Sequence, residues 1–384
     1  MGKPLFWCIP SKKKGIICPT NTDKFPDTRS SPGGDIPRSS GHTRDKIMSE
    51  TTHKERPILT DGMGRKIVNL RISVTDRCNF RCTYCMPADN VEFMDRGELL
   101  SFEEITQVAR VVAKMGIYRL RLTGGEPLLR KNLPTLVKML DGVEGIEDIA
   151  LTTNAFFLKD QAVALKEAGL KRLNISLDAL DKEKFTHVNR RDCLQEVLDG
   201  IAESRRVGFD SIKINAVAVK NFSEDEILKL VEMGREQDLE IRFIEFMPLD
   251  ADQTWERDKV LFGHEIIDII KEKYELVPIK DSLEIGPASE YSFADSKGKI
   301  GIITAVSNPF CDYCNRIRMT ADGKLRTCLF STNEHNLKEL IREGGTDADV
   351  EQRIRAALVT KEPGHKINLD SFERPVRAMH AIGG

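Results

Sequence analysis

Residues 68–87 read Val68-Asn-Leu-Arg-Ile-Ser-Val-Thr-Asp-Arg-Cys-Asn-Phe-Arg-Cys-Thr-Tyr-Cys-Met-Pro87, a β-type run followed at once by three cysteines. The run Val68–Val74 alternates apolar and polar residues, as a β-strand does. The cysteines Cys78, Cys82 and Cys85 follow in a C-x3-C-x2-C spacing. In barrels of parallel strands, the loops that follow the strands carry the chemistry. The stretch therefore predicts a strand that leads into a reactive cysteine loop.

Runs of this type recur along the chain and alternate with helix-length segments. Ser101–Glu104 has the sequence of a capping box and predicts a helix that ends near Gly116, and Ser223–Glu226 opens another that ends at Gly234 or shortly after it. Strands that alternate with helices imply a parallel sheet with right-handed crossovers. We therefore predict an α/β fold, a partial (β/α)6 TIM-type barrel over residues 61–285. Its six predicted strands are Val68–Val74, Tyr118–Thr123, Asp148–Thr153, Lys171–Leu177, Ser211–Val219 and Glu240–Phe246.

One face of these predicted strands is polar. Residues two apart in a strand share a face, and a closed barrel fills its lumen with Val, Ile and Leu. A polar face repeated over four strands indicates a lumen that holds a polar ligand. The other reading is a solvated outer face, but helices after every strand would cover the outside. The residues of this face are Asn69, Arg71, Ser73, Arg119, Arg121, Thr123, Asn174, Ser176, Asp178, Lys213 and Asn215.

The alternation stops after residue 285, and we expect an α+β extension over residues 286–384. It contains a second cysteine triplet, Cys311, Cys314 and Cys328. An Asp-Gly turn favours a hairpin here. The predicted elements are two antiparallel strands, the two strands of the hairpin, and two helices: Tyr291–Phe293, Lys299–Val306, Arg316–Thr320, Lys324–Phe330, Asn336–Glu343 and Asp347–Val359.

Each triplet supplies one thiol fewer than the four that usually hold an iron–sulfur cubane. A cubane on three cysteines keeps one iron without a protein ligand, and that iron can bind a small molecule. Two such sites indicate an enzyme that holds one reactant on each cluster. The alternative is zinc, which usually requires a fourth protein ligand nearby, and the first cysteine loop has no evident fourth ligand. Disulfides are not expected, because a chain of this size and charge without a signal peptide is usually intracellular.

The composition is that of a globular protein, with 40% hydrophobic residues, 31% charged residues and a formal net charge of -2. This balance gives no reason to expect binding to nucleic acid or to an anionic membrane, and no apolar run approaches the ~20 residues of a transmembrane helix. Residues 1–60 differ, because they are rich in Pro, Ser, Thr, Gly and Lys and predict a disordered tail. The tail is a candidate transit peptide, and a chain that starts at Met48 is an equal alternative.

Two motifs together carry a resemblance to a known superfamily. C-x3-C-x2-C with an aromatic residue before the last cysteine, followed by Thr123-Gly-Gly-Glu-Pro127 after the second strand, resembles the radical S-adenosylmethionine (SAM) enzymes. Glycines let the backbone approach a ligand closely, and the Glu126 carboxylate can accept from an ammonium group. In that superfamily this loop meets the amino group of SAM.

The second triplet narrows the resemblance. Pro309-Phe-Cys-Asp-Tyr-Cys-Asn-Arg-Ile-Arg318, then Gly323 and Cys328-Leu-Phe330, is similar to the GTP 3′,8-cyclases of molybdenum cofactor biosynthesis, and the terminal Gly-Gly agrees. The resemblance covers about residues 60–384. Two departures are visible: Ala155 stands where that family usually has glycine, and Met379-His-Ala-Ile382 is not the commonest form of the tail.

The resemblance implies two [4Fe-4S] clusters, one on each cysteine triplet, and SAM as the second cofactor. SAM bound to the open iron of the first cluster would yield a 5′-deoxyadenosyl radical. The radical would remove H3′ from GTP, and C3′ would attack C8 to give (8S)-3′,8-cyclo-7,8-dihydroguanosine 5′-triphosphate. The second cluster would hold the guanine through its open iron. Such an enzyme catalyses the first step of molybdopterin synthesis.

Site residues carry over position by position. The implied SAM contacts are Tyr84, Gly125, Ser176 and Met247. The implied GTP contacts are Arg71, Arg121, Thr152, Lys213, Arg316 and Arg318. The arginines and the lysine among them suit a substrate rich in phosphate oxygens. Gly383 and Gly384 belong to a tail that reaches the active site in this family.

The resemblance also implies partners and a location. We expect an electron donor, a homodimer, transfer of the product to cyclic pyranopterin monophosphate synthase, and neither nucleic acid nor membrane as a partner. The expected location is the cytoplasm, or the mitochondrial matrix if the tail is a transit peptide. Two other functions stay open: another radical SAM enzyme with an auxiliary cluster, such as a peptide-modifying maturase, and a non-catalytic zinc-binding scaffold.

Overall fold

The computed structural model describes residues 56–279 and 286–383, and these residues belong to one compact unit. The predicted disordered tail, residues 1–60, therefore lies outside the described residues as far as residue 55. Leu59, near its end, is buried in the main core. Within the described part, no helix has both the length and the apolar character needed to cross a membrane.

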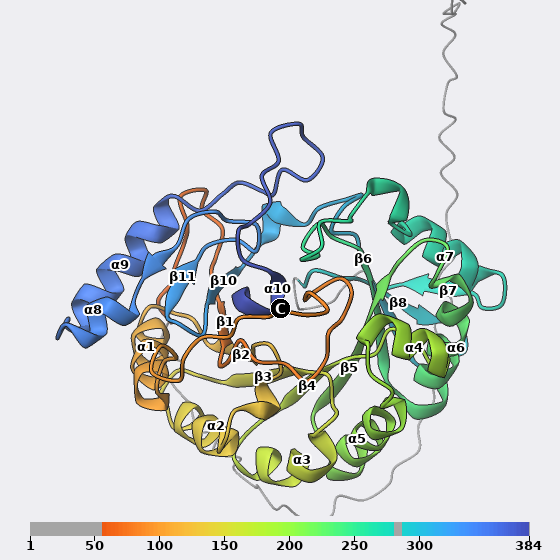
Figure 1. The fold of residues 1–384 in the computed structure, drawn as a ribbon, viewed down its shortest axis with the longest axis horizontal. Helices are drawn as coiled ribbons and strands as arrows, with labels where there is room; N and C mark the ends of the chain where they lie inside the picture. Colours follow the sequence, from red (N-terminus) through yellow and green to blue (C-terminus); the bar gives the residue numbers. More distant parts are fainter. Residues whose placement is uncertain (1–55, 280–285, 384) are drawn as a thin grey trace, which may run out of the picture. The chain divides into compact units, whose positions relative to one another are not determined.

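Six parallel strands form the centre of one curved sheet, and each is followed by a helix, as the sequence predicted (Figure 1). Neighbouring strands along the chain are also neighbours in the sheet, which is the order of a TIM-type barrel. Helices α1 to α6 cover the outside of the curve. The strands are β1 (Asn69–Ser73), β2 (Arg119–Thr123), β3 (Asp148–Thr153), β4 (Arg172–Ser176), β5 (Ser211–Ala218) and β6 (Glu240–Glu245). The helices are α1 (Phe102–Lys114), α2 (Leu133–Asp141), α3 (Leu158–Glu167), α4 (Lys182–Asn189), α5 (Leu194–Val207), α6 (Glu224–Gln237) and α7 (Gly263–Lys271).

The C-terminal region extends this sheet at both ends. Strand β9 (Lys299–Ile303) pairs in parallel with β6, and β10 (Arg316–Met319) pairs in parallel with β1. The sequence had indicated only the antiparallel neighbours of these strands, which the structure also contains. Because β10 lies beside β1, the segment that carries the second cysteine triplet is brought next to the strand that precedes the first. The division at residue 285 stays a sequence prediction.

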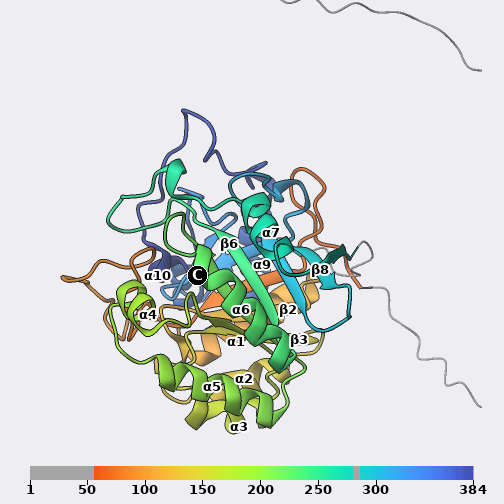
Figure 2. The same cartoon turned by 90° about the vertical axis from the view of Figure 1, so that its right-hand side faces the viewer.

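The remaining elements are short. The outer strands are β7 (Leu276–Pro278), β8 (Ser289–Phe293), β11 (Lys324–Arg326) and β12 (His335–Asn336), and the helices are α8 (Lys338–Arg342), α9 (Asp347–Val359) and α10 (Met379–Ile382). Helix α10 was not predicted. Figure 1 shows it within the outline of the ring of strands, and the side view of Figure 2 shows it on the same side as α4. The C-terminal segment thus occupies the lumen side of the barrel.

Local signals explain the helix starts. Ser101 and Glu104 form the predicted capping box at α1, with the Ser101 hydroxyl accepting from the Glu104 amide. At α6 the helix starts where expected, but the Ser223 hydroxyl accepts from the amide of Val219 and caps no helical amide. The carboxylate of Glu226 is fully buried and accepts from the amides of Leu180 and Asp181. Glu226 therefore fixes the loop after β4, a role that a helix-start pattern does not reveal.

Candidate active site

The first cysteine loop leaves the end of β1 and is held by two neighbouring segments. The amides of Arg81 and Thr83 donate to the carbonyls of Asn189 and Val188 at the end of α4, at 3.1 and 3.0 Å. On the other side, a Cβ at Gly125 would lie 2.3 Å from the carbonyl oxygen of Arg77, so only glycine fits this approach. The Gly-Gly motif therefore packs directly against the cysteine loop.

The thiols of this loop lie in a buried and partly acidic environment. Burial, reinforced by Glu126, raises the pKa of Cys78 to about 12, and burial raises that of Cys85 to about 12. A protonated thiol binds a metal more weakly than a thiolate does. A bound metal centre would therefore have to stabilise the thiolate form of these cysteines. The side-chain amide nitrogen of Asn154 lies 3.9 Å from Cys78 Sγ, and the Cys82 thiol donates to Asn189 Oδ1 at 3.1 Å. An N–H group that faces a cysteine sulfur, as that of Asn154 does, can tune an iron–sulfur cluster, whereas the Cys82 thiol would lose its proton on binding iron.

Each triplet supplies thiols, which as thiolates are the usual protein ligands of iron–sulfur cubanes. Among residues 56–279 and 286–383, no three His, Cys, Asp or Glu side chains are gathered in a way that would hold one metal ion.

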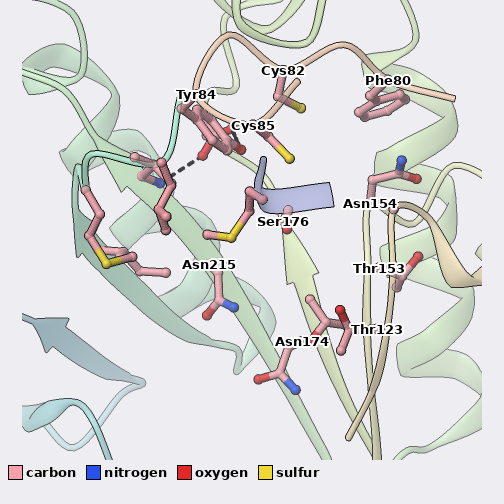
Figure 3. A pocket seen from close by; sticks show the side chains of 18 of the residues that line it. Phe80, Cys82, Tyr84, Cys85, Thr123, Thr153, Asn154, Asn174, Ser176 and Asn215 are labelled. Carbon is pink, nitrogen blue, oxygen red and sulfur yellow. Dashed lines mark hydrogen bonds between the residues drawn. The ribbon is translucent and has the colours of Figure 1, made fainter. Parts of the chain in front are cut away.

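A cavity of about 250 Å³ lies below the cysteine loop, inside the ring of strands. Figure 3 shows Cys82 and Cys85 on the loop above Asn174, Ser176 and Asn215 on the strands. Seven of the eleven residues predicted for the polar strand face line this cavity, and Asn69, Ser73, Arg119 and Lys213 are not part of its lining. The sequence-predicted site residues that line the cavity are Arg71, Cys78, Cys82, Tyr84, Cys85, Arg121, Gly125, Thr152, Ser176, Met247 and Arg318.

Three arginines lie side by side at one level of the cavity wall. In the strand registers, Arg71 pairs with Arg318 of β10 on one side and with Arg121 of β2 on the other. We refer to these three residues as the arginine row. Burial and the charges of neighbouring arginines lower the pKa of Arg121 and Arg318 to about 9, and that of Arg71 well below its ordinary value.

The arginine row has no anionic partner in the part of the chain that the structure describes. None of the three guanidinium groups forms an ion pair there, and the Nε atoms of Arg71 and Arg121 are buried without a hydrogen-bond partner. Buried cations are costly unless they are paired. The donor geometry of guanidinium matches carboxylate and phosphate oxygens. The row therefore has the chemistry needed to bind an anionic ligand with carboxylate or phosphate oxygens.

Two buried carboxylates fix the upper wall of the cavity. Asp178 accepts from the Tyr84 hydroxyl at 2.7 Å and from the Val217 amide at 2.8 Å, which ties the cysteine loop to β5. Glu126 accepts from the Thr153 hydroxyl and from the backbone amide of Asn154, both at 2.7 Å. Burial raises the pKa of Asp178 to about 6 and that of Glu126 to about 7, although their hydrogen bonds favour the carboxylates.

Two cysteines of the second triplet, Cys311 and Cys314, directly precede β10, and the third, Cys328, follows the neighbouring strand β11. Arg316 approaches Cys314 Sγ at 3.8 Å, and Arg65 donates to the carbonyl oxygen of Cys311 at 2.9 Å. Burial opposes thiolate formation, but the charges of Arg316 and Lys361 lower the pKa of Cys314 to about 7. Burial raises the pKa of Cys328. A cluster on these cysteines would therefore lie among cations.

Some predicted residues stand apart from the cavity wall. Lys213 pairs with Glu240 at 3.0 Å, so the argument from an unpaired cation applies to the arginine row and not to Lys213. Gly383 does not line the cavity itself, but Arg318, which does, donates to its carbonyl oxygen, and a Cβ at Gly383 would lie 3.2 Å from Ser73 Cβ. Gly384 lies outside the described residues.

Comparisons with known proteins place this geometry in a family. The Radical SAM superfamily model matches residues 72–234, and the Molybdenum Cofactor Synthesis C model matches residues 239–367. The GTP 3′,8-cyclase of Rhodopirellula baltica is 44% identical over 338 residues, which cover 87% of this chain and 94% of the relative. That of Mycolicibacterium smegmatis is 41% identical, with coverage of 85% and 92%. This chain belongs to the GTP 3′,8-cyclase family.

Solved structures agree on the fold. The structure of Streptococcus suis SuiB bound to S-adenosylmethionine aligns with a TM-score of 0.55 at 14% sequence identity, over 81% of this chain and 76% of SuiB. An identity this low shows the fold alone. The predicted radical SAM barrel and the predicted family are confirmed, and iron–sulfur clusters and SAM follow as the family's cofactors. The individual ligand and substrate contacts stay predictions.

Several residues at the site were not found from sequence. Asn154 and Asn189 lie beside Cys78 and Cys82, and Arg242 lines the cavity. Strand alternation placed Asn215 on the lumen face and so offered a signal for it. Asn189 is the last residue of α4 and has no local signal, because its contact with Cys82 depends on how α4 packs against the cysteine loop.

Proposed function

We propose that this chain converts GTP to (8S)-3′,8-cyclo-7,8-dihydroguanosine 5′-triphosphate by radical SAM chemistry, the first step of molybdenum cofactor biosynthesis. One observation carries the proposal: a buried arginine row without carboxylate partners lines a cavity below the first cysteine triplet. Arg318 of this row lies on β10, the strand that follows Cys311 and Cys314, so the anion-binding wall of the cavity borders the segment of the second triplet. A triphosphate nucleotide is the substrate class that uses all of these features.

The cofactors have separate places in this proposal. Cys78, Cys82 and Cys85 would hold the first cluster, and Cys311, Cys314 and Cys328 the second. Bound at the first cluster, SAM supplies a one-electron route to a carbon-centred radical. Tyr84, Gly125, Ser176 and Met247 line the cavity below the first triplet and would bind SAM. The orphaned buried donors of the arginine row and the three-thiol sets both fit these groups.

The chain's own residues orient GTP and exclude water. The guanidinium groups of Arg71, Arg121 and Arg318 would bind the phosphates, while Thr152, Lys213 and Arg316 are further proposed contacts. The carbonyl oxygen of Gly383 accepts a hydrogen bond from Arg318, which lines the cavity, so the tail would close the site around the substrate. Gly383 and Gly384 are thus proposed to act at the reacting centre. Enclosure protects a reactive intermediate from side reactions.

The proposal includes partners and a location. An external electron donor must reduce the first cluster, and the product would pass to cyclic pyranopterin monophosphate synthase. We expect a homodimer in the cytoplasm, where cysteine ligands stay reduced. The mitochondrial alternative depends on a tail that lies outside the described residues.

Equilibrium binding of GTP to the cluster-loaded full chain tests the arginine row. We expect Arg121→Met to weaken GTP binding by about tenfold or more, because a hydrogen bond to a charged group contributes about 1.5–3 kcal/mol. Arg206→Met, on the exposed surface of α5, is the matched control and should bind GTP as the wild type does. Wild-type affinity in Arg121→Met would refute the assignment of phosphate to the row.

A further inference from the structure

Lys361 is a buried lysine beside the second triplet that no step of the proposed reaction uses. It follows helix α9, and only 4% of the residue is exposed. Its ammonium group donates to the carbonyl oxygens of Arg316, at 3.2 Å, and of Thr327. The Thr327 carbonyl belongs to the peptide bond that leads into Cys328, and Arg316 is two residues from Cys314. Lys361 Nζ therefore lies between the segments that carry two of the three cysteines.

This ammonium has no carboxylate partner among residues 56–279 and 286–383. Glu362 is adjacent in sequence, but its carboxylate accepts from the Thr327 hydroxyl at 2.7 Å. Two neutral carbonyls leave the positive charge uncompensated, and burying such a charge is costly. An anion in the immediate neighbourhood would offset that cost. Lys361 Nζ is hydrogen-bonded to the backbone near Cys314 and Cys328, so thiolates that hold a cluster at these positions would supply the missing anion.

We propose that Lys361 tunes the second cluster: its buried charge stabilises the reduced cluster and raises its reduction potential. The inference rests on the proposed function, because it requires a cluster on the second triplet. Reduction adds one negative charge to the cluster, and a fixed cation nearby favours that charge in a low-dielectric interior. Charge and hydrogen bonding around the sulfurs are what set such potentials.

The first triplet has carboxylates as well as a cation nearby. Glu126 and Asp178 disfavour added negative charge at Cys78 and Cys82, whereas Arg81, which donates to the carbonyl oxygen of Cys78, favours it. Lys361 and Arg316 thus make the reduction potential of the second cluster higher than that of the first. The second cluster is the more easily reduced of the two, and the first is the stronger reductant.

A redox titration of the anaerobic full-chain holoenzyme, followed by electron paramagnetic resonance, tests the proposal. Addition of SAM identifies the signal of the first cluster, so the SAM-insensitive wave reports the second. We expect Lys361→Met, which keeps the length of the side chain but removes its charge, to shift this wave to a more negative potential. Lys361→Arg keeps the charge and should leave the potential of this wave close to that of the wild type. Glu362→Gln removes a negative charge and should shift the potential in the positive direction. Lys182→Met, exposed on α4, should leave both waves unchanged.

Iron analysis and thermal melting accompany the titration. About eight irons per chain indicate two cubanes, and about four would remove the second cluster and the inference together with the cofactor assignment. With two clusters present, an unchanged wave in Lys361→Met, or equal shifts of both waves, would overturn the role of Lys361 alone. If Lys361→Met fails to fold, Lys361→Gln takes its place, and an unchanged second wave in that variant would overturn the role of Lys361.

Discussion

At the scale of single residues, the cysteines of the two triplets differ in how readily they lose a proton. Burial raises the pKa of Cys78 and Cys85 to about 12. At Cys314, burial acts in the same direction, but Arg316 and Lys361 outweigh it and lower the pKa to about 7. The second triplet therefore contains a thiol that ionises near neutral pH in the absence of a cluster.

This difference predicts the order of alkylation in cluster-free protein. The thiolate is the nucleophile, so Cys314 should react with iodoacetamide first, with a rate that rises as the pH increases through about 7. Cys78 and Cys85 should react little below pH 10, because they stay protonated. Peptide mass spectrometry from pH 6 to pH 9 measures each site.

The control for this experiment is Arg316→Met, which removes one of the two cations. It should slow the alkylation of Cys314 at pH 7 and leave that of Cys193, a buried cysteine with a pKa raised to about 11, unchanged. Alkylation of Cys78 as fast as that of Cys314 would contradict the electrostatic description of both triplets.

Single residues also show where sequence reasoning ends. The cysteines were predicted because their spacing is local, and Tyr84 and Gly125 because they stand in short motifs. Lys361 and Asn189 were not, because each meets a triplet from a segment distant in the chain. Ala155 shows the same limit: it has a left-handed φ of 61°, which explains why glycine suits this position, yet the sequence alone gave no dihedral.

At the scale of elements, helix α5 packs very closely on the loop after β3. An ideal Cβ on Gly200 would lie 2.4 Å from the carbonyl oxygen of Ala155, so the helix or the loop would have to move. We expect Gly200→Ala to lower the free energy of unfolding by about 1–3 kcal/mol, the usual range for overpacking. Urea unfolding measures it.

Gly142→Ala is the matched control. Gly142 has an ordinary φ of -77° at the end of α2, and a Cβ there would meet backbone oxygens at 3.6 Å, a normal contact. This variant should stay within about 0.5 kcal/mol of the wild type. Equal stability of Gly200→Ala and wild type would show that α5 does not approach the loop as described.

The arginine row links three strands and carries a second consequence. In the ligand-free protein the three cations repel one another, so removing one should stabilise the fold. We expect Arg121→Met to raise the free energy of unfolding by about 0.5–2 kcal/mol, as substitutions at strained functional sites commonly do. Differential scanning calorimetry without nucleotide measures this change. A melting temperature below that of the wild type would show that other groups of the protein already offset the repulsion among the three arginines.

Strands β1 to β6 were predictable because alternation and turn signals are local. The parallel pairing of β9 with β6 and of β10 with β1 was not, because it joins segments far apart in the chain. The lumen face of Arg71 and Arg121 followed from the period of two in a strand. Their alignment with Arg318 depends on the register between strands, which no single strand encodes.

At the scale of the whole molecule, the C-terminal segment reaches the lumen of a barrel built from the N-terminal half of the described chain. A chain that ends at Ile382 keeps α10 but lacks Gly383-Gly384. We expect it to melt as the wild type does and to lose turnover by about 100-fold or more, since small misplacements at a reacting centre cost that much. The shorter chain that ends at Met379 should also be inactive, and cyclase activity in either would refute the role of the tail.

The most direct test of the central claim is an anaerobic assay of the reconstituted full chain with SAM, GTP and dithionite, with the nucleotides analysed by mass spectrometry. The proposed function predicts that GTP increases the formation of 5′-deoxyadenosine and that a cyclised isomer of GTP appears with it. Formation of 5′-deoxyadenosine at a rate that GTP does not change, with GTP recovered intact, would contradict the substrate and leave a radical SAM enzyme of another specificity.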